Sequence, residues 1–283
     1  MSDQFSNVKI LDICQDLIAL WKTRKDSEMR YRDRRTNPGL MKFLSVHGLV
    51  AHTYRVGEQA LTMCTSGATL EAMPLIRMSY ESALTSHWIA QNIDGAEALL
   101  NRDVHSREIA IRTLLNARSE VLRSGAQDFP AADAELLRTS SKAQARNFEQ
   151  LCRDLEPGGV DAYAYYRLMS WYSHPSSRII DSYVVPTEDR QNISALRLEP
   201  AETDTIMWVH FLAYSFVWAG RAVDFVDADR THRNKLRDAA RTLGIAEVLK
   251  LSDKAKLRTA KAEKEERRAN WKSPRQKDSN ESP

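Results

Sequence analysis

Residues 205–220 read TIMWVHFLAYSFVWAG and form the longest run of the chain without an Asp, Glu, Lys or Arg residue. Asp204 and Arg221 bound this run, and His210 lies inside it. About 20 predominantly apolar residues are needed to cross the hydrocarbon layer of a membrane, so sixteen with a histidine among them are too few. We therefore predict a buried helix in the core of a soluble protein that makes no membrane contact.

The spacing of apolar side chains in the rest of the chain also predicts helices. Stripes at spacings of three, four or seven residues mark one face of each helix. The clearest stripes are Ile10, Cys14, Leu17 and Trp21; Phe43, His47, Val50, Tyr54 and Leu61; Leu70, Met73, Arg77, Tyr80, Leu84 and Trp88; Ala110, Leu114, Ala117 and Val121; and, more loosely, Leu136, Phe148, Leu151 and Leu155. No strands alternate with these segments. The pattern predicts an all-α fold, a bundle of about six or seven long helices.

The segment from about 176 to 200 does not follow the helical pattern. It holds the β-branched pairs Ile179-Ile180 and Val184-Val185, then Pro186 and a polar turn. β-Branched residues favour strands, and a proline marks a strand edge or a turn. We predict one long irregular loop here, with a candidate small hairpin inside it.

Composition divides the chain into three parts. Residues 1–36 are an N-terminal helix with a basic end, residues 37–249 form the helical bundle domain, and residues 250–283 form a charged tail. The tail holds eleven Lys and Arg against six Asp and Glu residues. We expect a solvated helix that frays into a disordered tail, and the alternative is a basic arm that touches nucleic acid.

Charge and cysteine content exclude several classes of protein. The formal net charge of +3 is too close to balance to indicate a polyanion partner for the whole chain. Cys14, Cys64 and Cys152 are too widely spaced for a disulfide framework or a zinc site, which predicts a reduced, cytoplasmic protein. Because no Walker loop, HExxH or CxxC motif is present, we predict neither a metal site nor a cofactor.

The most informative polar residues lie in residues 163–174, which read YAYYRLMSWYSH. Tyr166, Ser170 and His174 are spaced by four, so a helix places them on one face. Arg167 comes seven residues before His174, two turns away. Pro175 follows immediately and disfavours helical geometry at His174, so we expect the helix to end there.

A second polar pair lies on an apolar stripe. Arg77 and Glu81 are four residues apart on or beside the stripe that runs from Leu70 to Trp88. An unpaired charge in such a position costs free energy, so these side chains require partners. We predict that their helix packs against the face that carries Tyr166, Ser170 and His174.

Taken together, Arg77-x3-Glu81 and Tyr166-x3-Ser170-x3-His174-Pro175 resemble the motifs of a bacterial all-α family of unknown function. More distantly, the chain resembles the HEPN superfamily of helical-bundle ribonucleases from toxin and phage-defence systems. In that superfamily four to six residues separate an arginine from the histidine that follows it, and Arg167-x6-His174 matches the long end of this range. HEPN proteins usually have a polar residue after the arginine, where this chain has Leu168, so Arg77 is the alternative arginine.

The HEPN resemblance implies metal-independent cleavage of RNA in a bacterial defence or stress setting. His174 would be the general acid or base, and Arg77 or Arg167 would stabilise charge on the phosphate. Ser170 and Tyr166 would orient the imidazole or contact phosphate, and Glu81 would hold Arg77. The resemblance also implies a homodimer.

Three further interpretations stay open. Arg30, Arg32, Arg34 and Arg35 flank Tyr31 and Asp33, a pattern that suits RNA contacts but also suits a solvated helix end. A buried polar row in a bundle often only fixes helix register, so the alternative function is a non-enzymatic interaction scaffold whose polar cluster is structural. A weaker alternative is a small-molecule pocket on the tyrosine-rich helix.

Overall fold

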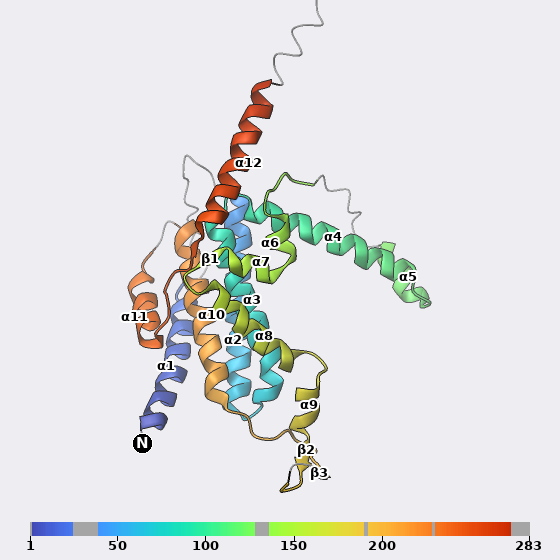
Figure 1. The fold of residues 1–283 in the computed structure, drawn as a ribbon, viewed down its shortest axis with the longest axis vertical. Coiled ribbons are helices and arrows are strands. Elements are labelled where there is room, and N and C mark those ends of the chain that lie inside the picture. Colours follow the sequence, from blue (N-terminus) through green and yellow to red (C-terminus); the bar gives the residue numbers. More distant parts are fainter. Residues whose placement is uncertain (1, 25–38, 128–135, 190–191, 228–229, 273–283) are drawn as a thin grey trace, which may run out of the picture.

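The computed structural model describes residues 2–24, 39–127, 136–189, 192–227 and 230–272, and it confirms the predicted all-α class (Figure 1). Within these ranges the helices are α1 (Ser2–Lys22), α2 (Leu40–Thr65), α3 (Thr69–Gln91), α4 (Gly95–Leu115), α5 (Glu120–Gln127), α6 (Lys142–Arg146), α7 (Phe148–Arg153), α8 (Gly159–Ser173), α9 (Ser177–Ser182), α10 (Thr205–Val226), α11 (Arg233–Leu243) and α12 (Asp253–Lys272). Six of these helices have 20 or more residues and α8 has 15.

Helix α10, which contains the uncharged run, is the core helix. It packs against α1, α2, α3 and α11. Length and composition alone would allow this helix to cross a membrane, yet 78% of its most apolar window is buried inside the structure. Because Trp208, Leu212 and Phe216 of this helix are fully buried, the predicted buried core helix is confirmed.

A stack of aromatic rings joins three of the core helices. The ring of Tyr54 in α2 lies between Trp21 of α1, at 4.9 Å between centroids, and Phe216 of α10, at 5.0 Å. The Tyr54 hydroxyl donates a hydrogen bond of 2.8 Å to the backbone oxygen of Phe216. A side chain at Gly57 would overlap the Phe216 ring, so glycine is required where α2 and α10 approach this closely.

The segment from 176 to 200 contains the predicted hairpin and one element that was not predicted. Strands β2 (Val184–Pro186) and β3 (Ile193–Leu196) pair antiparallel, with Val184 opposite Leu196. Before them lies the short helix α9, which follows α8 directly in the chain (Figure 1). The segment is therefore less irregular than we expected.

A tight corner sets the position of α8 against α3. Strand β1 (Leu155–Glu156) leads through Pro157 to Gly158, whose φ of +92° lies in the left-handed region that favours glycine. A side chain at the next residue, Gly159, would collide with the backbone oxygen of Cys152. These two glycines let α8 begin directly beside α7 and then pack along α3.

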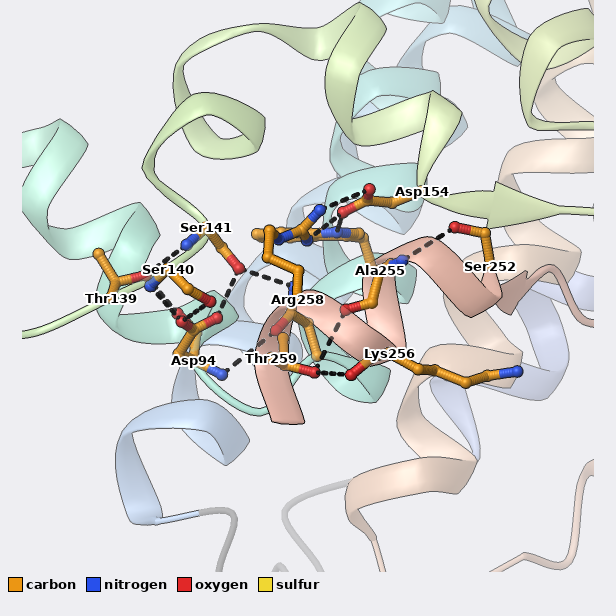
Figure 2. A network of polar contacts seen from close by, with 12 residues as sticks. Asp94, Thr139, Ser140, Ser141, Asp154, Ser252, Ala255, Lys256, Arg258 and Thr259 are labelled. Atoms are coloured by element: carbon orange, nitrogen blue, oxygen red, sulfur yellow. Dashed lines mark hydrogen bonds and ion pairs between the residues drawn. The ribbon is translucent and has the colours of Figure 1, made fainter. Parts of the chain in front are cut away.

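The start of the C-terminal segment contacts the bundle. Strand β4 (Lys250–Leu251) pairs antiparallel with β1, and Leu251 and Ala255 are buried. Arg258 of α12 binds both carboxylate oxygens of Asp154, at 2.9 and 2.6 Å (Figure 2). The division of the chain at residue 250 stays a prediction, but residues 250–259 are held by the bundle and are not a free tail.

His87 of α3 is a fully buried histidine whose two ring nitrogens both have backbone partners. Nδ1 lies 3.0 Å from the backbone oxygen of Trp218, and Nε2 lies 3.0 Å from the backbone oxygen of Leu249 and 3.1 Å from its backbone nitrogen. A neutral imidazole with its hydrogen on Nδ1 donates to Trp218 and accepts from the N–H of Leu249, whereas the other tautomer donates to the Leu249 oxygen. Burial lowers the pKa of His87 to about 4, because a charged imidazolium would lose its hydration there.

We expect His87 to make the fold sensitive to acid. The unfolded chain binds a proton at this histidine below a pKa of about 6.5 but the folded chain only near 4, so stability falls as pH decreases between these values. The free energy of unfolding should lose about 2 kcal/mol by pH 5 and about 3 kcal/mol by pH 4. Urea denaturation at several pH values measures this loss.

Two variants provide the comparison for this pH dependence. His87→Gln should be less stable at pH 7 but lose less stability between pH 6.5 and 4, because glutamine does not titrate. His52→Gln, at an exposed position of α2, should keep the wild-type slope. Equal slopes for wild type and His87→Gln would show that His87 is not the group that titrates.

Candidate functional site

Helices α3 and α8 bring four of the predicted site residues together. Nη1 of Arg77 lies 3.0 Å from Nε2 of His174, and Nη2 of Arg77 donates a hydrogen bond of 2.5 Å to the hydroxyl oxygen of Tyr166. The guanidinium carbon also lies 4.7 Å from the centre of the Tyr166 ring. Glu81 pairs with Arg77 at 3.7 Å. We call Arg77, Glu81, Tyr166 and His174 the polar cluster.

The contacts of Arg77 fix the hydrogen positions in the polar cluster. A guanidinium group donates hydrogen bonds and accepts none. Nε2 of His174 is therefore the acceptor in this arrangement, and the imidazole hydrogen lies on Nδ1. The Tyr166 oxygen also accepts from Arg77, which leaves its own O–H free to donate. The cluster thus presents a cation beside an imidazole that is able to accept a proton.

The polar cluster lies at the surface of the bundle. His174 is exposed, and the side chains of Arg77 and Glu81 are 20% and 31% exposed. His174 follows the last residue of α8 and has extended backbone angles, with φ −129° and ψ 154°. This is the helix end that Pro175 predicted. A ligand from solvent can therefore reach the imidazole.

Ser170 and Arg167 lie on α8 but do not contact His174. The Ser170 hydroxyl donates a hydrogen bond of 2.8 Å to the backbone oxygen of Tyr166, inside its own helix. Arg167 is exposed on another side of α8. The pKa of Glu149 is lowered mainly by a hydrogen bond from Arg153, and the charge of Arg167 adds to this effect. Of the two candidate arginines, Arg77 is the one in contact with His174.

The other predicted contact residues are not placed. Arg30, Arg32, Arg34 and Arg35 lie outside the described residues. Their assignment to RNA binding stays a prediction.

A pocket of about 140 Å³ adjoins the polar cluster and was missed by the sequence analysis. Glu81 and Tyr166 line it together with Gln144, Phe148 and the junction arginines, by which we mean Arg102 and Arg146. Gln144 is 8% exposed, and its Oε1 has no hydrogen-bond partner among the described residues. The sequence carried one signal for a polar site here, because Gln144 of α6 lies between the basic residues Lys142 and Arg146. Nothing in that spacing connects α6 to α3 or α8.

The described residues do not suggest metal or thiol chemistry. Within them, no group of three or more His, Cys, Asp or Glu side chains is arranged to hold a metal ion. Cys14, Cys64 and Cys152 are buried and form no disulfide. Burial raises the pKa of Cys64 to about 11, which keeps its thiol protonated at neutral pH.

Comparison with known families gives one match. The family of unknown function DUF5677 matches residues 44–192, which is more than half of the chain. The chain belongs to this family. The DUF5677 match includes all four residues of the polar cluster and the pocket beside them, whereas the core helix α10 lies outside it.

The DUF5677 match confirms the coarse part of the resemblance found in the sequence, a family of unknown function. No curated protein and no solved structure matches the chain. The resemblance to HEPN ribonucleases therefore stays a prediction.

Proposed function

We propose that this DUF5677 protein cleaves RNA without a metal ion and that the polar cluster is its reaction centre. The observation that carries the proposal is the contact of Arg77 with both His174 and Tyr166 at an exposed site. Phosphoryl transfer requires two things, a group that accepts a proton and a positive charge that lies close to the phosphate. An imidazole with an unprotonated nitrogen, a guanidinium and a phenol supply these within one cluster.

The proposed reaction uses the 2′-hydroxyl of RNA as the nucleophile. A phosphate replaces the imidazole as the acceptor for Arg77, which frees Nε2 of His174. The 2′-hydroxyl passes its proton to Nε2 as its oxygen attacks phosphorus, and the bond from phosphorus to the 5′-oxygen breaks. The leaving oxygen takes a proton from water, and the hydroxide that remains takes the proton from the His174 imidazolium, so the products are a 2′,3′-cyclic phosphate and a 5′-hydroxyl. Arg77 stabilises the charge on the phosphate oxygens, and Glu81 holds Arg77 in place.

The second candidate function is a helical scaffold in which the polar cluster is structural. It is favoured by the position of the Arg77 guanidinium over the Tyr166 ring, because such a contact joins α3 to α8 whether or not a ligand binds. Under this interpretation His174 only completes the hydrogen bonds of Arg77.

The direct test is an assay with purified protein and 5′-labelled single-stranded RNA in excess EDTA. We expect cleavage to continue in EDTA and the fragments to end in 2′,3′-cyclic phosphate. RNA with 2′-O-methyl groups should stay intact, because its 2′-oxygen has no proton to lose. Absence of cleavage, or fragments with 5′-phosphate ends, would contradict the proposal. The homodimer and the defence or stress setting stay predictions.

A further inference from the structure

A groove lined by basic side chains runs between α4, residues 136–141 and α6. It has a volume of about 350 Å³. Its charged and titratable lining residues are Arg102, His105, Glu108, Arg138, Lys142 and Arg146. The four Arg and Lys residues are exposed, and in the described part of the chain none of them forms an ion pair. Glu108 is the single carboxylate in this lining, and it lies 3.8 Å from His105.

The groove and the pocket beside the polar cluster are neighbouring spaces. Both are lined by the junction arginines, Arg102 and Arg146. Arg138 and Lys142 line the groove alone, whereas Glu81 and Tyr166 line the pocket alone. A row of cations therefore leads from the groove to the residues that contact Arg77.

One wall of the groove is held in place by side-chain hydrogen bonds, of which those of Asp94 with Ser140 and Ser141 are shown in Figure 2. Oδ2 of Asp94 accepts from the backbone N–H and the hydroxyl of Ser140, at 2.6 and 2.8 Å, and Oδ1 accepts from Ser141 at 2.5 Å. The Asn101 side chain binds both the N–H and the oxygen of Leu137, at 2.9 and 2.7 Å. Because Arg138 lies between these anchored residues, the wall is formed before a ligand arrives, which lowers the entropic cost of binding.

The inner pocket has the chemistry of a site for one nucleobase. Phe148 and Tyr166 line it with ring centroids 4.3 Å apart, and aromatic side chains are common stacking partners of unpaired bases. The Gln144 amide lines the same pocket and is more than nine-tenths buried, and its oxygen has no hydrogen-bond partner in the described part of the chain. An amide is able to hydrogen-bond to the edge of a base, whereas a base pair does not fit into a space of this size.

We propose that the groove binds the backbone of single-stranded RNA and that the pocket receives one of its bases next to the polar cluster. This inference rests on the proposed function. Arg138 and Lys142 contact phosphates away from the reaction centre, and the junction arginines guide the strand from the groove to the pocket. Cations that contact phosphates contribute affinity that is independent of sequence and sensitive to salt.

The test measures RNA binding in the His174→Ala background, so that the RNA is not cleaved during the measurement. The groove variant carries Arg138→Glu and Lys142→Glu. The control carries Arg55→Glu and Lys235→Glu, which changes the net charge equally at two exposed residues outside the groove. Fluorescence anisotropy with a labelled single-stranded RNA gives the dissociation constant at several KCl concentrations.

We expect the groove variant to bind RNA at least about tenfold more weakly than the control at low salt. Its plot of log affinity against log salt should be shallower by about 1.4, because each lost contact with a single-strand phosphate removes about 0.7. A milder pair, Arg138→Gln with Lys142→Gln, should show the same change in slope without charge reversal. Equal affinities of the groove variant and the control would overturn the inference.

The outcomes separate this inference from the proposed function. If wild type cleaves RNA and the groove variant binds as well as the control, the inference is wrong and the proposed function stands. If the His174→Ala background binds double-stranded RNA more tightly than single-stranded RNA, the assignment of the pocket to an unpaired base is wrong. If wild type neither cleaves nor binds RNA, both proposals are wrong.

Discussion

Replacement of His174 with alanine is expected to slow RNA cleavage by a factor of about 10²–10⁴, the usual contribution of a general acid or base. The side chain is exposed, and among the described residues its hydrogen bond is to Arg77, which keeps its contacts with Tyr166 and Glu81. The fold should therefore survive, with a melting temperature close to that of wild type. Cleavage rates under single-turnover conditions measure the effect on the chemical step.

A matched control and a second variant make this expectation specific. His52→Ala removes an exposed imidazole from α2 and should leave the cleavage rate unchanged. Arg77→Lys keeps a positive charge but has no planar group to contact both His174 and Tyr166, so its rate should also fall. Wild-type activity in His174→Ala would remove the imidazole from the mechanism. A marked drop in its melting temperature would instead support the scaffold interpretation.

The sequence was sufficient to predict the encounter of α3 with α8. Arg77 lies on a stripe whose other members are buried, so its charge was expected to find partners, and Glu81 of its own helix and a residue of a neighbouring helix were the candidates. Tyr166 was one such partner, since it begins the polar row on α8. This reasoning needs only the helical period and the cost of burying a charge, and both apply before any coordinates are known.

Spacing alone could not assign the roles of Arg167 and Ser170. The seven-residue spacing places Arg167 beneath His174 only if the helix continues to His174, but the backbone there is extended. Tyr166 faces Arg77, and its neighbour Arg167 is turned by about 100° around the helix, toward the side of Glu149. Ser170 shares a face with Tyr166, yet its hydroxyl binds a backbone oxygen one turn earlier. Such local hydrogen bonds are common for serine in helices.

The apolar stripes also predicted helices that run past the ends of the observed ones. The stripe from Ala110 to Val121 crosses a break between α4 and α5, and the looser stripe from Leu136 to Leu155 covers α6, α7 and β1. Between α6 and α7, the side chain of Asn147 accepts hydrogen bonds from the N–H groups of Glu149 and Gln150 and caps α7. Asparagine is a preferred residue at helix starts, so this break carried a signal that the apolar pattern concealed.

Replacement of Asp154 with alanine is expected to lower the free energy of unfolding by about 3 kcal/mol and to release α12 from the bundle. The Asp154 side chain is 7% exposed and accepts hydrogen bonds from two nitrogens of Arg258 (Figure 2). It also accepts one from Nε1 of Trp88, at 3.0 Å. Removal of one partner from a buried ion pair costs about 3–5 kcal/mol. The lower end applies because the Arg258 side chain is 22% exposed and water partly replaces its partner.

Two variants separate the loss of charge from the loss of an acceptor. Asp154→Asn keeps an oxygen for Trp88 but removes the negative charge that pairs with Arg258, so it should be less destabilising than Asp154→Ala. Asp253→Ala removes an exposed carboxylate that pairs with Lys256 on α12, and its urea midpoint should match that of wild type. Hydrogen exchange should show faster exchange of the α12 amides in Asp154→Ala alone. Among the described residues, the pair of Arg258 with Asp154 is the one ion pair that joins α12 to the bundle. Unchanged protection of the α12 amides in Asp154→Ala would therefore mean that apolar contacts such as those of Leu251 and Ala255 hold the helix without Arg258.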